Sequence, residues 1–191
     1  MMTPTHMLAG GMLGALAPGT ESVLWGMAGG LLPDLDLLFG KHRRTLHFPW
    51  LYGLGSGAAQ FLSALTGGSG LVAVFLAAAS VHSISDRFAG AELRSWDRDS
   101  WRDEAVYDHV RNKWMSPARL VHGGSPRDLA LCVSLGAALM FTGVAPVARG
   151  LTGALVVTGV GMFLIIRRFG AAVPDRYNTL NSYVRDRLGL S

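Results

Sequence analysis

The chain has a single cysteine and few charged residues for its length. Cys132 stands alone among 191 residues and cannot form an internal disulfide, so nothing in the sequence requires an oxidising compartment. Charged side chains make up 16% of the residues, whereas soluble domains carry about 25%. No Lys or Arg precedes Ala15, which argues for a retained first helix and against a cleaved signal peptide. These scarcities disfavour a soluble domain.

Hydrophobic residues are abundant and grouped. They make up 50% of the chain, and the mean hydropathy is +0.32. Most apolar segments approach the roughly 17–25 residues that cross a bilayer, where the backbone must be helical. We therefore predict an all-α fold, a polytopic membrane helical bundle forming one integral-membrane domain over residues 1–191. Its about six transmembrane helices correspond to the apolar segments 5–17, 21–39, 49–66, 70–86, 128–145 and 151–166.

The basic residues predict the orientation of this bundle. If all six segments cross, one face carries 16 of the 17 Lys and Arg residues, and the other face carries only Arg149. By the positive-inside rule, the basic face is cytoplasmic. We expect a plasma-membrane protein with both termini in the cytoplasm, a cytoplasmic loop at 87–127 and a cytoplasmic tail at 169–191. Because topology accounts for the pI near 9.7 and the charge of +4, we expect no nucleic acid partner.

The polar loop at 87–127 is too long for a simple turn. Within it, Val106, Val110 and Trp114 recur every four residues, which predicts an amphipathic helix over 103–114 that lies at the membrane surface or caps the bundle. Interfacial anchoring is expected of Trp96, Trp101 and Trp114. The loop histidines, His109 and His122, are predicted to be ordinary surface residues.

The predicted topology brings a set of imidazoles and carboxylates to the cytoplasmic face. His82 and Asp86 are four residues apart, so they share one face of a helix. Asp34 and Asp36 converge only if the helix breaks, which Pro33 and the glycines before it favour. Asp34 has an alternative role as a helix cap. The full set is His6, Asp34, Asp36, His42, His47, His82 and Asp86.

This set has the chemistry of a metal site. Ionisable residues inside a membrane are costly and are functional candidates by default. Four His and three Asp exceed what one tetrahedral zinc needs, so we expect one to three divalent ions, preferably Zn, with a bridging carboxylate. We predict that Asp36 and Arg43 are catalytic residues. A carboxylate that is not bound to metal would act as general base, and Arg43 or Arg44 would stabilise developing negative charge. Arg43 and Arg44 are also the predicted substrate-binding residues, suited to phosphate oxygens.

These residues also carry a family resemblance over about residues 5–90. The order His6, Pro33-Asp34-Leu35-Asp36, His42-Arg43-Arg44-Thr45-Leu46-His47 and His82-Ser83-Ile84-Ser85-Asp86 resembles the YdjM-like family of membrane-bound, predicted metal-dependent hydrolases. The stretch 94–128 resembles haloarchaeal members. The family pattern places Thr directly before the second His, whereas Leu46 intervenes here. The resemblance implies a metal-dependent hydrolase, and a distant similarity to zinc-dependent phospholipase C enzymes implies phosphoester or lipid substrates.

The predicted function is therefore that of a membrane-bound hydrolase acting on a phosphoester or lipid-linked substrate at the cytoplasmic face, with membrane lipids as partners. Two alternatives remain open. An ion or metal transporter would need polar residues that continue across the bundle, and only Gln60, Ser63, Ser80 and Thr158 are available. A non-catalytic scaffold, binding a partner through the loop, would not need His82 or Asp86.

Overall fold

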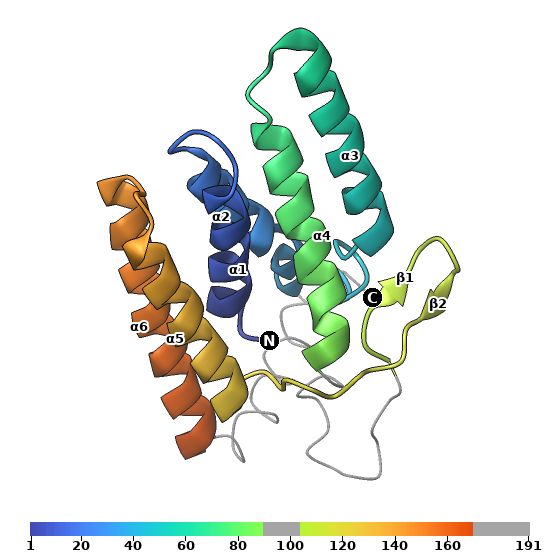
Figure 1. The fold of residues 1–191 in the computed structure, drawn as a ribbon. Helices are drawn as coiled ribbons and strands as arrows, with labels where there is room; N and C mark the ends of the chain where they lie inside the picture. Colours follow the sequence, from blue (N-terminus) through green and yellow to red (C-terminus); the bar gives the residue numbers. More distant parts are fainter. Residues whose placement is uncertain (90–103, 170–191) are drawn as a thin grey trace.

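The computed structural model describes residues 1–89 and 104–169, and it confirms a mostly helical fold (Figure 1). Trp96, Trp101 and the tail predicted after residue 169 lie outside this part of the chain. The described elements are α1 (Thr3–Ala15), α2 (Ser22–Leu31), the 3₁₀ helix η1 (Leu32–Leu37), α3 (Pro49–Thr66), α4 (Leu71–Ala89), β1 (Tyr107–Asp108), β2 (Lys113–Trp114), α5 (Pro126–Phe141) and α6 (Pro146–Phe169).

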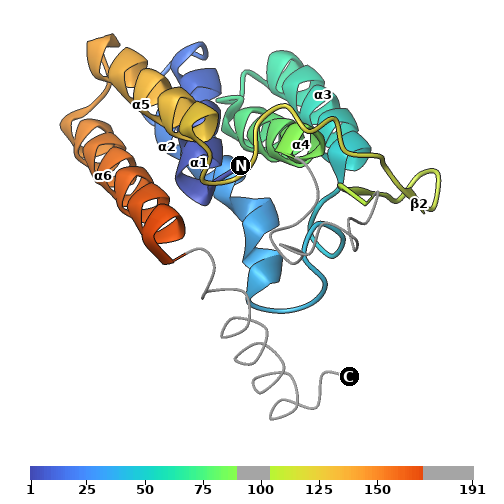
Figure 2. The ribbon, with the colours of Figure 1, turned by 90° about the horizontal axis from the view of Figure 1, so that it is seen from below.

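The helices run alternately up and down as three antiparallel pairs. Viewed along the helices, α1 and α2 lie in the middle, with α3 and α4 on one side and α5 and α6 on the other (Figure 2). The short α1–α2, α3–α4 and α5–α6 connections all lie at one end (Figure 1). The opposite end holds the start of α1, η1, the start of α3 and the end of α4. This is the end at which the sequence places its histidines and aspartates.

Glycines allow the central helices to touch backbone to backbone. A Cβ atom added at Gly10 would lie 2.1 Å from the carbonyl oxygen of Gly26, and one added at Gly26 would lie 2.1 Å from that of Gly10. Such contacts are typical of helix packing in membranes, where small residues let backbones approach. They bring α1 against α2 closely enough for side chains near the start of α1 to reach η1.

The helix that begins at Ser22 changes character at Leu32. It continues as a 3₁₀ helix through Pro33, Asp34 and Asp36 to Leu37. Pro33 has no backbone N–H and fits the first turn of a new helical segment, which explains the position of the change. The predicted break is therefore present, as a tightening of the helix. No side chain caps the start of η1, so the alternative role of Asp34 as a cap is not adopted there.

The prediction of an amphipathic helix over 103–114 is wrong for the part of this stretch that the structure describes, 104–114. These residues form an antiparallel hairpin that pairs Tyr107 with Trp114 and Asp108 with Lys113. The Asp108 carboxylate accepts hydrogen bonds from the amides of Val110 and Arg111, both at 3.0 Å. Asn112 adopts a left-handed φ of 53°. Local bonds of this kind compete with a helix, and they favour a turn over the four-residue spacing of the valines.

Two of the helices described within 1–89 and 104–169, α4 and α6, are long and apolar enough to cross a membrane. The other helices fall short of that length or hydropathy. Large apolar side chains are nevertheless exposed on most of the bundle. On α3 they are Trp50, Leu51, Leu54, Phe61, Leu62 and Leu65.

A buried aspartate joins α5 to α1. The Asp128 carboxylate accepts hydrogen bonds from the amide of Met2 at 2.8 Å, the hydroxyl of Thr5 at 2.8 Å and the amide of Gly124 at 3.0 Å. Ser125 is the N-cap of α5. Cys132 is buried and free.

Candidate metal centre

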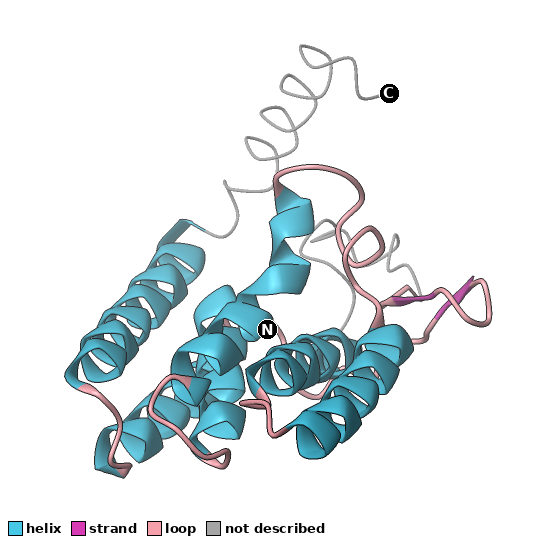
Figure 3. Ribbon diagram, turned by 90° about the horizontal axis from the view of Figure 1, so that it is seen from above, coloured by secondary structure: helices cyan, strands magenta, loops and turns pink. Residues whose placement is uncertain are grey.

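All seven predicted site residues gather at one end of the bundle. They come from four segments: α1, η1, the 38–48 loop and α4. That loop leaves η1 and passes the strands before α3 begins (Figure 3). Six of the seven are buried, and His42 is half-buried. The alternation of the helices is the physical reason for the convergence, because it returns the chain to this end after each pair.

Four of these residues offer ligand atoms to one point. In Asp34, His47, His82 and Asp86, one such atom from each lies within 4.8 Å of all the others. His47 Nε2 is 3.2 Å from Asp86 Oδ2, and His82 Nε2 is 3.3 Å from Asp34 Oδ1 and 3.6 Å from Asp86 Oδ2. A tetrahedral zinc with bonds of about 2.0–2.1 Å separates its ligands by about 3.3 Å. These three separations are close to those in a four-coordinate site, and the other pairs lie within 4.8 Å.

The hydrogen bonding of His82 adds an independent observation. Its Nδ1 donates to the carbonyl oxygen of Gly30 at 2.6 Å, so Nδ1 carries a proton. Its Nε2 is buried and makes no hydrogen bond within the described part of the chain, although two carboxylates lie nearby. A second proton or a cation at that position would balance the carboxylate charge. A backbone carbonyl that accepts from the other ring nitrogen is the usual support of a metal-binding histidine.

A second group of ligand atoms adjoins the first and shares His47 with it. It consists of Asp36, His42 and His47. Asp36 Oδ1 lies 2.8 Å from His42 Nδ1, and Asp36 Oδ2 lies 2.9 Å from His47 Nδ1. Asp34 and Asp36 thus belong to different groups, as expected from two residues on opposite sides of a helix. His47 links the groups because its two ring nitrogens face in different directions.

His6 lies beside these groups without joining either. Its Nε2 is 2.9 Å from Asp86 Oδ1, and its ring stacks on that of His82 with centroids 3.7 Å apart. Asp86 therefore faces His6 with one oxygen, and His47 and His82 with the other. The same Oδ1 lies 3.3 Å from the nitrogen of Met1.

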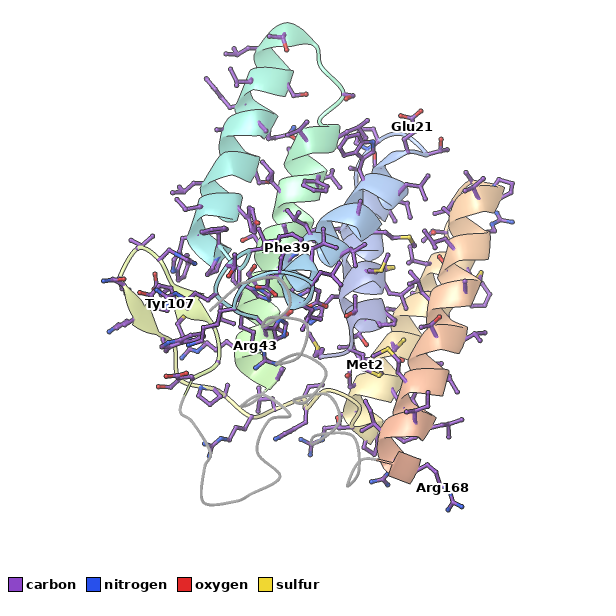
Figure 4. All side chains as sticks on the ribbon, turned by 180° about the vertical axis from the view of Figure 1, so that it is seen from behind. Met2, Glu21, Phe39, Arg43, Tyr107 and Arg168 are labelled. Atoms are coloured by element: carbon purple, nitrogen blue, oxygen red, sulfur yellow. The ribbon has the colours of Figure 1, made fainter. Side chains whose placement is uncertain are left out.

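The two predicted substrate-binding arginines are placed differently. Arg43 is buried, and its Nε lies 3.7 Å from Asp86 Oδ2 (Figure 4). The guanidinium of Arg44 lies over the ring of Tyr107, 4.5 Å from its centroid. The structure thus brings Arg43 to the cluster and Arg44 to the hairpin.

The electrostatic balance of the cluster depends on its carboxylates. Asp34, Asp36 and Asp86 are all buried, and burial alone would penalise three negative charges. Burial also opposes a charged His47, but its hydrogen bonds to Asp36 and Asp86 outweigh that effect and raise the pKa of His47. The site therefore favours positive charge near these carboxylates, whether from imidazolium, guanidinium or a metal ion.

Several supporting groups were not predicted. The hydroxyl of Thr3 donates to Asp34 Oδ2 at 2.6 Å, which leaves Oδ1 facing His82. The hydroxyl of Tyr52 donates to the carbonyl of Leu46 at 2.9 Å, next to His47. Such contacts have no sequence signature, because the two partners are separated along the chain. Only the expectation that ligating carboxylates are themselves hydrogen-bonded could have pointed to Thr3.

The loop histidines lie away from the cluster. His122 is exposed, as predicted. His109 is half-buried and donates from Nε2 to the carbonyl of Arg44 at 2.6 Å, so it has a structural contact that the prediction of a surface residue missed. Three of the polar residues that a transporter would use bond to the backbone. Ser80 bonds to Pro49, Ser63 to Gly68 and Thr158 to Ala154, each at a backbone carbonyl.

No family model, curated protein or solved structure matches this chain. The resemblance to YdjM-like hydrolases stays a prediction from the motif residues.

Proposed function

We propose that the protein is a membrane-bound, metal-dependent hydrolase that cleaves a phosphoester at the cytoplasmic face. The observation that carries the proposal is the buried Nε2 of His82, which faces Asp34 and Asp86 and has no hydrogen bond among residues 1–89 and 104–169. A buried polar atom without a partner costs free energy unless something absent from the chain satisfies it. A divalent ion at this point would satisfy His82 and neutralise carboxylate charge.

In this proposal the ligands are Asp34, His47, His82 and Asp86. Two imidazoles and two carboxylates suit Zn, which accepts both in tetrahedral sites. Asp36 has both oxygens engaged by His42 and His47, so we assign it the role of orienting these rings. This revises the prediction that Asp36 is itself a metal ligand and a catalytic residue. A second ion held by Asp36, His42 and His47 is the alternative arrangement of the same atoms.

The proposed chemistry follows from this arrangement. A divalent ion at the four ligands would lower the pKa of a bound water toward about 7 and polarise the phosphoryl group. Arg43, beside Asp86, would stabilise negative charge on the phosphoryl oxygens. His42 keeps 18% of its side chain exposed and is held by Asp36, so it is placed to exchange a proton with reacting groups.

Membrane attachment is supported by α4 and α6 and by the exposed apolar side chains of the other helices. The 10 and 6 residues of α2 and η1 follow one another, and at about 1.5 and 2.0 Å per residue they extend about 27 Å. That length approaches the hydrocarbon thickness of about 30 Å. Of the described Lys and Arg residues, only Arg149 lies at the end away from the cluster, which supports a cytoplasmic site.

A phosphoester substrate is supported by the cationic character of the site end. Arg43 is buried there beside carboxylates, and Lys41, Arg44, Arg87 and Arg111 lie in segments around it. Guanidinium groups recognise phosphate oxygens through paired hydrogen bonds. A site at headgroup depth in a bilayer suits a lipid-linked substrate.

Elemental analysis of the purified full chain tests the proposal. We expect about one zinc or similar ion per chain. Replacing both His82 and Asp34 with Ala should abolish metal binding, whereas His122→Ala, an exposed histidine outside the cluster, should retain it. Wild-type protein without stoichiometric metal, purified without chelators, would contradict the proposal. Metal retained by the double variant would show that the ion binds at another site.

A further inference from the structure

The hairpin formed by β1 and β2 is hydrogen-bonded to backbone carbonyls of the 38–48 loop. The amide of Tyr107 donates to the carbonyl of Arg43 at 2.9 Å, and His109 Nε2 donates to the carbonyl of Arg44 at 2.6 Å. These bonds fix two successive peptide groups between His42 and His47. The hairpin therefore contacts the loop at Arg43, whose cationic side chain reaches the cluster.

Side chains reinforce this contact on both sides. The guanidinium of Arg44 covers the Tyr107 ring, and the ammonium of Lys41 lies 4.7 Å from the centroid of the Trp114 ring. At the other end of the loop, Trp50 donates from Nε1 to Asp108 Oδ2 at 3.1 Å. The hairpin is thus attached at several points within the loop and at Trp50 just after it.

The loop residue that bonds to Tyr107 has an unusual backbone conformation. Arg43 has a φ of 63°, in the left-handed region that non-glycine residues rarely adopt. The conformation turns its side chain inward, where its Nε lies 3.7 Å from Asp86 Oδ2 (Figure 4). A strained conformation persists only where its surroundings hold it, and the hydrogen bond from Tyr107 is such a restraint.

The inward position of Arg43 has a chemical consequence. Asp86 Oδ2 lies 3.7 Å from Arg43 Nε and 3.2 Å from His47 Nε2, so the guanidinium borders the group of four ligand atoms. A phosphate group placed against the guanidinium would have its remaining oxygens toward those ligands. Arg43 is suited to this role because its planar donors match phosphate oxygens.

We propose that the hairpin is a clamp that holds Arg43 inward and thereby forms a phosphate-binding site beside the four ligand residues. In this assignment Arg43 contacts the phosphate, and His109, Tyr107 and Trp50 are positioning residues. The proposal rests on the proposed function only in taking this phosphate to be the group that is hydrolysed. Phosphate binding itself can be measured without turnover.

The test compares variants of the clamp by binding of inorganic phosphate to the purified full chain in detergent. His109→Ala removes one hydrogen bond to the loop and should weaken phosphate binding by about 3- to 10-fold. His109→Gln keeps a donor and should restore most of the affinity. Val110→Ala is the matched control, because Val110 is 65% exposed at the tip of the hairpin. Trp50→Phe removes the hydrogen bond to Asp108 and should also weaken phosphate binding. It keeps the clamp testable if His109→Ala fails to fold.

Metal content is measured on the same samples. Reduced phosphate affinity with unchanged metal content supports the clamp, since a general loss of structure would remove both. The clamp is overturned if His109→Ala and Trp50→Phe bind phosphate as Val110→Ala does, if both lose metal as well, or if wild-type protein binds no phosphate. Wild-type protein that binds phosphate but holds no metal would instead overturn the proposed function and leave the clamp standing.

A short-chain phosphatidic acid identifies the source of the phosphate group. The phosphatidic acid is added as a competitor of bound inorganic phosphate. If it displaces that phosphate far more strongly than additional inorganic phosphate does, the site is assigned to a lipid phosphate headgroup. Equal competition would assign it to free phosphate or a soluble phosphate ester. Both results support a phosphate site at Arg43, provided that Arg43→Ala abolishes the competition.

Discussion

His82 donates from Nδ1 to the carbonyl oxygen of Gly30, and this bond decides which ring nitrogen can bind a metal. The remaining nitrogen, Nε2, is directed at Asp34 and Asp86. Gly30 reaches this position because it has no side chain. A Cβ atom there would lie 2.4 Å from the carbonyl oxygen of His6. The packing of α1 on α2 and the tautomer of His82 are therefore linked through one glycine.

Gly30→Ala should consequently destabilise the protein. The methyl group meets backbone atoms of α1, which cannot move aside as a flexible side chain would. Overpacking of this kind costs about 1–3 kcal/mol. Denaturant unfolding of the purified protein measures the change. Gly57→Ala is the matched control, because nothing lies within 4 Å of a Cβ added there. Equal stability of the two variants would show that α1 and α2 do not pack as described.

Asparagine substitutions should separate the roles of the two aspartates in η1. Asp34→Asn removes a ligand charge and should lose the metal, whereas Asp36→Asn should keep the stoichiometry and weaken affinity by about 10- to 100-fold. The difference arises because Asp36 contacts His42 and His47 through their Nδ1 atoms. Titration of chelator-treated protein with zinc measures both quantities. Two ions in wild-type protein and one in Asp36→Asn would instead identify a second metal site.

Arg43 offers a test of backbone strain. Its φ of 63° suits glycine better than any residue with a Cβ. Arg43→Gly and Arg43→Ala both remove the guanidinium, so their difference reports the backbone alone. Arg43→Gly should be the more stable variant by about 1 kcal/mol, the scale of left-handed strain. Denaturant unfolding of the two variants side by side checks this. A more stable Arg43→Ala would mean that the residue does not adopt this conformation.

Much of the fold follows from local rules that the sequence displays. α3 begins at Pro49 and ends at Thr66, as predicted, because Pro suits the first helical turn and Gly67 adopts a left-handed φ of 70° after the last. The gathering of the site residues at one end follows from the alternation of the apolar segments. Asp34 and His82 could be placed at the same end in this way without any knowledge of their contacts.

Other features depend on contacts that have no local signature. The 107–114 hairpin was mistaken for a helix because the turn bonds of Asp108 outweigh a short hydrophobic spacing. The carbonyl of Arg43 accepts a hydrogen bond from Tyr107, a partner 64 residues away. The division of Asp34 and Asp36 between two groups depends on how the 38–48 loop folds back onto η1. Pairwise packing between distant segments determines these features.

Asp108 should make the hairpin sensitive to acid. Burial works against its charge, but hydrogen bonds from the Arg111 amide, Trp50 and the Val110 amide lower its pKa below the ordinary value. A lowered folded-state pKa stabilises the fold above the unfolded-state pKa of about 3.9, and that contribution is lost as the pH falls through the folded-state value. The amide NMR signals of Val110 and Arg111 should therefore titrate with a midpoint below about 3.9. A midpoint above that value, or none in wild-type protein, would contradict the turn. Asp108→Asn is the control, because it should remove the transition.

The single native cysteine makes the membrane orientation directly testable. Cys132 is fully buried, so an impermeant maleimide should leave the wild-type protein unlabelled. Ser69→Cys places an exposed thiol in the α3–α4 connection, and Lys113→Cys places one on the hairpin at the opposite end (Figure 1). Because positively charged segments stay in the cytoplasm, intact cells should label Ser69→Cys, and Lys113→Cys should react only after permeabilisation. Labelling of Lys113→Cys in intact cells would reverse the orientation and put the metal centre outside. Release of the protein from membranes by alkaline carbonate would contradict the proposed membrane attachment. The metal site would then be tested by metal binding alone.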